Sequence, residues 1–258
     1  MQVRASFCGI FETAHNLVAS FRLFGDYMSP ENILRERYII CASWKWLGEK
    51  KVHAVSVLDD PERYAENPYD DYHVLSTLHK VLSEADFIVA HNVDKFDWKF
   101  FQGRLLIQGF APLPPIVSID TLKVAKRNFL FNANRLDYLG KILKVGRKIE
   151  TTSGLWLKVL QGDTDAIKKV VKYNKGDVQL LERVFLKLRP YIKKIPTFMP
   201  GLVCPKPGCH SARVQHRGKA ITSTRTYQRY QCQDCGGWFQ GVKADKPEAD
   251  QPAIEVKC

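Results

Sequence analysis

Short apolar runs typical of β-strands alternate with helical patterns along most of this chain. Residues 37–57 contain two β-rich runs around Leu47–Lys50, a pattern that indicates a hairpin. A helical pattern runs from about Asp71 to Ala85 and leads into the apolar run Phe87–Ala90, which is typical of a buried strand. After Thr152 the pattern is helical to about Tyr191. This alternation predicts an α/β fold in which helices flank a sheet.

Three acidic residues lie at the ends or starts of apolar elements, or within the late helix. Glu12 ends a β-rich run, Asp97 begins the helix after Phe87–Ala90, and Asp177 follows Tyr173 by one helical turn. Because residues four apart are neighbours on a helix, Asp177 could hold a divalent cation while Tyr173 positions a water. Asp97 and Asp177 each have a plainer alternative. Asp97 could simply be favoured by the helix dipole, and Tyr173 with Asp177 could be a half-buried ring beside a solvated charge.

Together these segments resemble the DEDD family of 3′-5′ exonucleases, which have a ribonuclease H-like fold, over roughly residues 3–192. The Tyr-x-x-x-Asp spacing resembles the tyrosine subclass, nearest the proofreading-type domains of family B DNA polymerases. The resemblance implies a mixed sheet flanked by helices, and hydrolysis at a 3′ end with two Mg²⁺ or Mn²⁺ ions. It implies that Glu12, Asp97 and Asp177 ligate the ions. It also implies that Tyr173 orients the attacking water and that Asn92 acts as an orienting hydrogen-bond group.

The first motif of that family normally reads Asp-x-Glu, but Ile10 stands where the aspartate is expected. An isoleucine cannot ligate a cation, whereas two-metal catalysis clamps two oxygens between ions about 3.5–4 Å apart. Three alternatives follow: a catalytically degenerate protein that still binds nucleic acid, an enzyme with a rearranged site, or an altered sequence. Asp94 and Asp120 are candidates for a replacement ligand, although aspartates at such positions more often cap helices or fix turns.

The charge of the chain favours a nucleic-acid partner. Its 39 Lys and Arg exceed its 27 Asp and Glu, giving a formal net charge of +12, and phosphate backbones are the commonest acidic partner of such a surface. Basic residues are concentrated between Lys123 and Lys148, interleaved with aromatic residues. From this stretch we expect Lys126, Arg127 and Arg135 to contact nucleic acid, with single-stranded DNA ends as the favoured substrate.

No apolar run approaches the roughly 18 residues of a membrane span, and the N-terminus lacks a signal-peptide pattern. We therefore expect a soluble, cytoplasmic protein that does not bind membranes. A small free-standing nuclease of this design would suit a phage or mobile-element genome, in which case the location is the host cytoplasm.

A second domain is expected after a proline-containing linker at 193–202. Two pairs of cysteines, Cys204 with Cys209 and Cys232 with Cys235, suit a structural, tetrahedral Zn²⁺ site. A disulfide is the alternative, and His210 could substitute for one thiolate. Residues 203–242 resemble a zinc ribbon of the kind found in nucleic-acid-handling proteins. The remaining residues, 243–258, are expected to lack fixed structure.

The ribbon itself carries basic residues among aromatic ones. Arg217, Arg225 and Arg229 lie near Tyr230 and Trp238 in the sequence, a combination that favours contact with nucleic acid. Zinc ribbons also bind proteins. A different class of function therefore stays open, in which the chain is an adaptor whose ribbon docks a replication or recombination protein.

Overall fold

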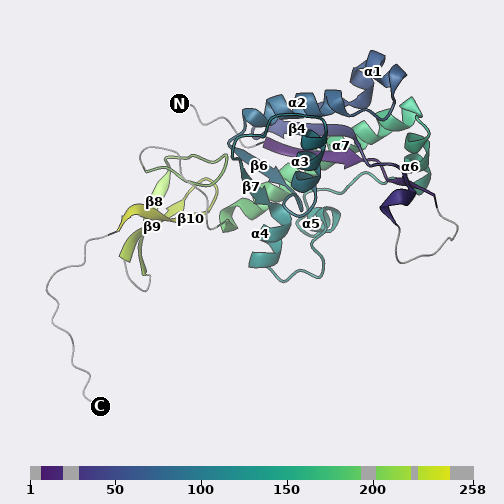
Figure 1. Cartoon of the computed structure of the whole chain (residues 1–258). Coiled ribbons are helices and arrows are strands. Elements are labelled where there is room, and N and C mark those ends of the chain that lie inside the picture. The colour runs from purple at the N-terminus through teal and green to yellow at the C-terminus, as the bar shows by residue number, and fades with distance from the viewer. Residues whose placement is uncertain (1–6, 20–28, 193–201, 222–225, 245–258) are drawn as a thin grey trace, which may run out of the picture. The chain divides into compact units, whose positions relative to one another are not determined.

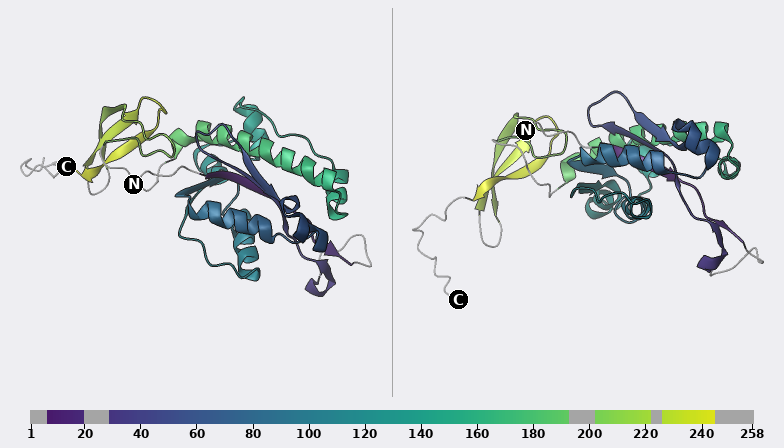
Figure 2. Two further views of the ribbon diagram at one scale, coloured as in Figure 1. Left: turned by 90° about the horizontal axis from the view of Figure 1, so that it is seen from above. Right: turned by 45° about the horizontal axis from the view of Figure 1, so that its top comes forward.

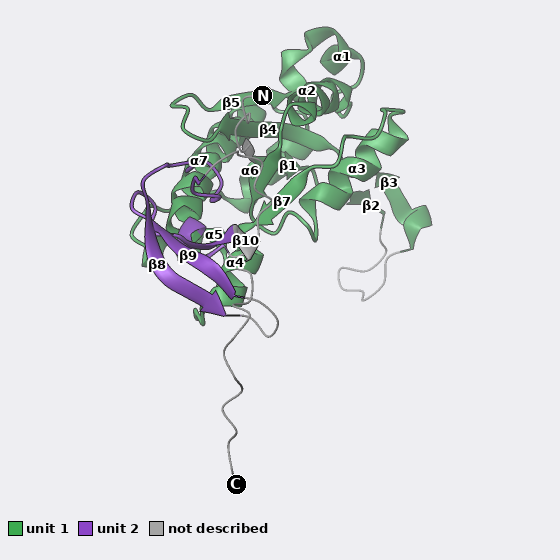
Figure 3. Ribbon diagram, turned by 90° about the vertical axis from the view of Figure 1, so that its left-hand side faces the viewer, with its two compact units in different colours: residues 1–188 green, residues 189–258 purple. Residues whose placement is uncertain are grey.

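The computed structural model describes residues 7–19, 29–192, 202–221 and 226–244 (Figure 1). The chain divides into two compact units, residues 1–188 and 189–258 (Figure 3). The expected linker at 193–202 falls outside the described residues except at its last position, and so does the expected tail beyond residue 244. Among the described residues, no helix is both long and apolar enough to cross a membrane.

A five-stranded mixed sheet forms the centre of the first unit. Its order is β5 (His53–Ser56), β4 (Ile39–Trp46), β1 (Phe7–Thr13), β6 (Phe87–Ala90) and β7 (Val117–Asp120). The first three strands are antiparallel, whereas β6 runs parallel to both β1 and β7. The hairpin expected at 37–57 is confirmed as β4–β5, and the strand that carries Glu12 joins it to form the antiparallel side.

Helices cover both faces of this sheet (Figure 2). The long helix α7 packs on β1 and β4 from one side, and α2 lies on the other. The helices of the unit are α1 (Pro61–Glu66), α2 (Tyr72–Ser83), α3 (Asp97–Ile107), α4 (Thr121–Asn128), α5 (Leu136–Ile142), α6 (Ser153–Leu160) and α7 (Thr164–Leu188). Because both of its faces are covered, β4 is buried along nearly its whole length, as expected for the middle of such a layered fold.

Two short strands and three short 3₁₀ turns complete the first unit and its boundary. Strand β2 (Leu17–Val18) pairs antiparallel with β3 (Ile33–Arg35), which the sequence analysis did not anticipate. The 3₁₀ turns are Pro30–Asn32, Val57–Asp59 and Arg189–Tyr191.

A buried ion pair ties α2 and α3 to the sheet. The Arg104 guanidinium donates two hydrogen bonds to the Asp71 carboxylate, at 2.8 and 2.7 Å. Asp71 Oδ2 also accepts the backbone N–H of Ile39, at the start of β4. The Asp71 side chain is wholly buried, so the pair satisfies polar groups that would otherwise be costly inside the core.

The expectation of continuous helix from Thr152 to Tyr191 is wrong at one point. Helix α6 ends at Leu160 and α7 begins at Thr164. Gly162 between them has a φ of 80°, a conformation that glycine adopts without strain. The side chain of Asp163 then accepts the backbone N–H groups of Asp165 and Ala166, so a glycine turn followed by a capping aspartate starts a new helix.

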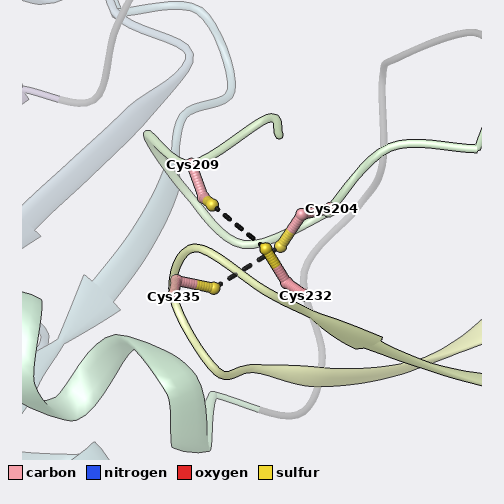
Figure 4. Close-up of side chains that lie close together, drawn as sticks. All are labelled: Cys204, Cys209, Cys232 and Cys235. Carbon is pink, nitrogen blue, oxygen red and sulfur yellow. Dashed lines mark hydrogen bonds between the residues drawn. The ribbon is translucent and has the colours of Figure 1, made fainter. Parts of the chain in front are cut away.

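The second unit contains a three-stranded antiparallel sheet. Its order is β10 (Trp238–Ala244), β9 (Thr226–Cys232) and β8 (Val214–Ile221). Cys204 and Cys209 lie in the segment before β8, and Cys232 and Cys235 lie at the turn between β9 and β10. Figure 4 shows the two pairs close together at one end of the strands.

Candidate functional site

Strand β1 and helix α7 bring Glu12 beside the segment that carries Tyr173 and Asp177. Asn174 and Asp177 lie one turn apart on α7 and are both fully buried. Asn174 donates a hydrogen bond of 3.4 Å from Nδ2 to Glu12 Oε1. Two segments separated by most of the first unit therefore meet at Glu12 through Asn174, a residue that the sequence analysis missed. Its spacing of three residues before Asp177 was the available signal.

Lys148 reaches the same helix from the loop between α5 and α6. Its ammonium donates hydrogen bonds to Asp177 Oδ2 at 2.5 Å and to the Tyr173 hydroxyl at 2.9 Å. The backbone N–H of Lys148 is held in turn by Asp137 Oδ1 at 2.8 Å. Tyr173 and Asp177 thus share one helix face, as their spacing predicts. The place of Lys148 beside them was not anticipated, because the sequence analysis grouped it only with other basic residues.

The carboxylates share one electrostatic environment. Burial, reinforced by the charges of Asp177 and Asp97 and opposed by Lys148, raises the pKa of Glu12 to about 7. Burial, with a contribution from the Asp120 charge, raises the pKa of Asp97 to about 7. Burial also raises the pKa of Asp177 against the opposing charge of Lys148. Burial disfavours the ionised form of a carboxylate, and this effect is the largest cause of the raised pKa at all three residues.

The environment of these carboxylates fits a divalent cation in part. Asp177 Oδ1 is buried and has no hydrogen-bond partner among the described residues, and hard oxygen donors of this kind suit Mg²⁺ or Mn²⁺. Across the described ranges, however, the four cysteines are the only group of three or more potential ligands whose ligand atoms all lie within 4.8 Å of one another. Glu12, Asp97 and Asp177 do not converge to that degree. The donor set therefore suits a cation better than it suits a closely bridged pair of ions.

Ile10 occupies the position where the resemblance implies an aspartate. It lies on β1 two residues before Glu12 and pairs with Ser43 of β4, and side chains two apart on a strand point to the same face. Ile10, Asp97 and Lys148 line one cavity of about 140 Å³ whose other walls are mostly apolar. Position 10 thus presents an alkyl group where a two-ion site would need a ligand.

Both aspartates considered as replacements make structural contacts. Asp120 Oδ1 accepts the backbone N–H groups of Leu122 and Lys123 and caps α4, and it also accepts the N–H of Asn92 at 2.8 Å. Asp94 pairs with Lys123 Nζ at 2.7 Å. Asn92 has a φ of 67°, a left-handed conformation that asparagine tolerates better than most residues. These contacts agree with the plainer alternative of capping and turn formation for Asp94 and Asp120.

The basic residues of the first unit that are expected to contact nucleic acid are exposed. Lys126 and Arg127 are in the last turn of α4, and Arg135 precedes α5. None of the three lines the cavity bordered by Ile10 and Lys148, and none lines the second cavity, beside Tyr173.

A basic groove beside Tyr173 was not anticipated from the sequence. It is a cavity of about 470 Å³ lined by Tyr173, by Lys158, Lys169 and Lys172, and by residues of the loop before α6. All three lysines are exposed. We call this cavity the lysine groove. It offers positive charge directly beside the Tyr173 side chain.

The four cysteines of the second unit form a compact cluster (Figure 4). Cys204 Sγ lies 3.6 Å from Cys235 Sγ, and Cys209 Sγ lies 3.7 Å from Cys232 Sγ. A disulfide bond is about 2.05 Å long, and all four residues are free thiols, so the disulfide alternative is not supported. His210 is not part of the cluster. Four sulfurs drawn from two turns are the ligand set of a structural zinc site.

The sheet of the second unit presents basic and aromatic side chains together. Arg217 and Arg229 are exposed, and the Arg229 guanidinium lies 5.3 Å from the centre of the Trp238 ring. Trp238 is itself 47% exposed. Arg225 lies outside the described residues.

Comparison with known proteins gives a family but no curated relative. A family model described as RNase_H superfamily matches residues 48–189 of the sequence. These residues include Asp97, Lys148, Tyr173 and Asp177 but not Glu12. None of the curated proteins compared with the chain matches it. Members of this superfamily are mostly nucleases, so the match supports a function in nucleic-acid processing and the use of divalent metal ions. Because the match covers more than half of the sequence and the mixed α/β fold agrees with it, the chain belongs to the RNase H superfamily.

Proposed function

We propose that this protein is a metal-dependent 3′-5′ exonuclease whose substrate is the end of a single DNA strand. The observation that carries the proposal is the meeting of β1 and α7. There Glu12 contacts Asn174 of α7, and Tyr173 and Asp177 of the same helix both contact Lys148. Glu12, Tyr173 and Asp177 are three of the four side chains that the resemblance to the tyrosine subclass implies, and Asp97 is the fourth.

Glu12 and Asp97 are the side chains that would hold a divalent ion, because neither is ion-paired within the described part of the chain. When bound, such an ion polarises water and phosphate oxygens. The protein supplies the positioning. Asn174 fixes one oxygen of Glu12, and the hydrogen bond that Lys148 donates to the Tyr173 oxygen holds the phenol in place beside Asp177, where its hydroxyl would orient the attacking water.

The lysine groove supports a strand of nucleic acid leading to Tyr173. Its three lysines come from α6 and α7 and border the cavity that Tyr173 also lines. Phosphate contacts of this kind make affinity depend on salt. We expect the triple variant Lys158→Gln/Lys169→Gln/Lys172→Gln to bind single-stranded DNA more weakly and with a shallower salt dependence, reduced by about two units of slope. Fluorescence anisotropy between about 50 and 200 mM salt measures both effects. An unchanged slope would remove the groove from the binding path.

The second unit is proposed to be a zinc ribbon that adds a contact to the substrate. The four-cysteine cluster supplies the metal ligands. Arg229 and Trp238 offer a cation and an exposed ring on one sheet, a pairing that suits unpaired bases and their phosphates.

A second candidate function is favoured by Ile10. If the missing ligand has abolished catalysis, the chain is a nucleic-acid-binding protein that retains the fold. The two candidates differ in one measurement, which is the release of nucleotides from single-stranded DNA in Mg²⁺ or Mn²⁺.

The test compares two aspartates that both lie in the first turn of a helix. Asp97 opens α3, and Asp165, in the first turn of α7, has a side chain that is 77% exposed. If the protein is an exonuclease, Asp97→Asn should lower the rate of nucleotide release at least about a hundredfold, since even groups that only hydrogen-bond to a metal ligand are worth about 10- to 100-fold. The control variant Asp165→Asn should release nucleotides at the rate of the unaltered protein. Salt-sensitive binding without any release by the unaltered protein would establish the binding protein instead.

A further inference from the structure

Two departures from a two-ion site occur together in this chain. Position 10 carries an isoleucine, and the ammonium of Lys148 contacts Asp177. Ile10 and Lys148 also line the same cavity, together with Asp97. The isoleucine that stands in place of an expected ligand and the lysine that adds a cation therefore line the same cavity.

The two departures balance in charge. Replacing an aspartate at position 10 by isoleucine removes one negative charge from the site. Replacing a divalent ion by an ammonium removes one positive charge. The total charge around the substrate phosphate is then the same as in a site with four carboxylates and two divalent ions. Charge balance matters here because unpaired buried charges are expensive.

Lys148 is also held where it can meet a substrate. A lysine ammonium has three N–H donors, and two of those of Lys148 are directed to Asp177 Oδ2 and the Tyr173 hydroxyl. The Asp177 side chain is fully buried, whereas that of Lys148 is 32% exposed. The Asp177 end of the ion pair thus lies inside the protein, whereas the Lys148 side chain is partly exposed. A divalent ion that bound Asp177 Oδ2 would first have to break a short, charge-assisted hydrogen bond from Lys148.

We propose that Lys148 takes the place of one of the two divalent ions: the site binds a single divalent cation at Glu12 and Asp97, and the Lys148 ammonium, anchored by Asp177 and Tyr173, contacts the substrate phosphate. This inference rests on the proposed function for its substrate, but the number of ions it predicts does not depend on activity.

The test counts bound Mn²⁺ in the full chain after its cysteine cluster has been loaded with zinc. Titration calorimetry, checked by the electron paramagnetic resonance signal of free Mn²⁺, gives the number of ions per chain. We expect one ion in the unaltered protein, in Lys148→Met and in Ile10→Asp, because each single variant corrects only one departure. The double variant Ile10→Asp/Lys148→Met should bind two. Lys187→Met, which removes an exposed lysine of α7, is the control and should bind one ion.

Several results would overturn the proposal. Two ions, or none, in the unaltered protein would do so. A second ion gained by Ile10→Asp alone would show that Lys148 does not exclude it. A double variant that keeps its cooperative unfolding transition but still binds one ion would show that the two positions do not substitute for a metal.

The contact with phosphate has its own measurement. With Mn²⁺ saturating, Lys148→Met should weaken the binding of deoxyadenosine 5′-monophosphate by about tenfold or more, the effect of losing one hydrogen bond to a charged group. Lys187→Met should change it less than about twofold, and an equally small change in Lys148→Met would refute the contact. A chain that binds one ion but releases no nucleotide would contradict the proposed function and leave this inference standing.

Discussion

Removing one partner of the buried pair of Asp71 and Arg104 should strongly destabilise the first unit. Asp71 joins the start of α2 to β4 through the Ile39 N–H and to α3 through two hydrogen bonds from Arg104. The Arg104 side chain is 13% exposed and that of Asp71 is fully buried. Arg104→Met keeps an apolar stem of similar length but removes the guanidinium. It leaves a buried carboxylate without its counter-charge.

Breaking a buried ion pair from one side costs about 3–5 kcal/mol. With an m value of about 3 kcal/mol per molar urea, the midpoint of unfolding should fall by about 1–2 M. Ellipticity at 222 nm in a urea titration reports this unit, because every α-helix of the described residues lies within it. The control is Lys168→Met, which removes a cation from the exposed pair with Asp165. Such a surface pair is worth at most about 1 kcal/mol.

A second substitution tests the physical reason. Asp71→Asn combined with Arg104→Met removes the stranded charge but keeps an oxygen that can accept the Ile39 N–H. We expect the double variant to be more stable than Arg104→Met alone. If Arg104→Met unfolds at the same urea concentration as Lys168→Met, or if adding Asp71→Asn destabilises it further, the cost does not come from an uncompensated buried charge.

Two further predictions concern packing and metal binding. A Cβ at Gly140 of α5 would lie 2.6 Å from the Gly146 carbonyl oxygen, whereas one at Gly103 of α3 would meet nothing within 4 Å. In urea titrations Gly140→Ala should therefore lower the free energy of unfolding by about 1–3 kcal/mol, while Gly103→Ala raises it by about 1 kcal/mol; equal effects would contradict this packing. Elemental analysis should find one zinc per chain, lost in Cys209→Ser and retained in His210→Ala, because only the cysteine belongs to the cluster; retention in Cys209→Ser would show that another group completes the site.

The sheet was predictable because its strands have recognisable local sequence patterns. Phe87–Ala90 is an uninterrupted apolar run, and all four residues are buried. The break between α6 and α7 was not predictable by periodicity, because the apolar spacing continues on both sides of Gly162 and a single glycine within a helical pattern is often tolerated. Trp156 of α6 packs against the core of the first unit.

The candidate site was predictable where its residues share an element. Tyr173 and Asp177 lie on one helix, so their spacing alone placed them together. Lys148 comes from a loop and meets Asp177 only through the packing of α5 and α7. No local sequence pattern predicts the contact between Lys148 and Asp177, since tertiary packing determines it. The lysine groove was missed for the same reason, because its residues come from two helices and the loop before α6.

The direction in which single-stranded DNA is digested tests the central claim, a 3′-5′ exonuclease activity, most directly. A single-stranded DNA labelled at its 5′ end is incubated with the zinc-loaded chain and Mg²⁺ or Mn²⁺, beside the variant Asp177→Asn. A 3′-5′ exonuclease predicts a ladder of labelled products that shorten one nucleotide at a time from the 3′ end, and the variant should produce none. Immediate release of a labelled mononucleotide, cuts confined to internal positions, or a ladder that persists in Asp177→Asn would contradict the account.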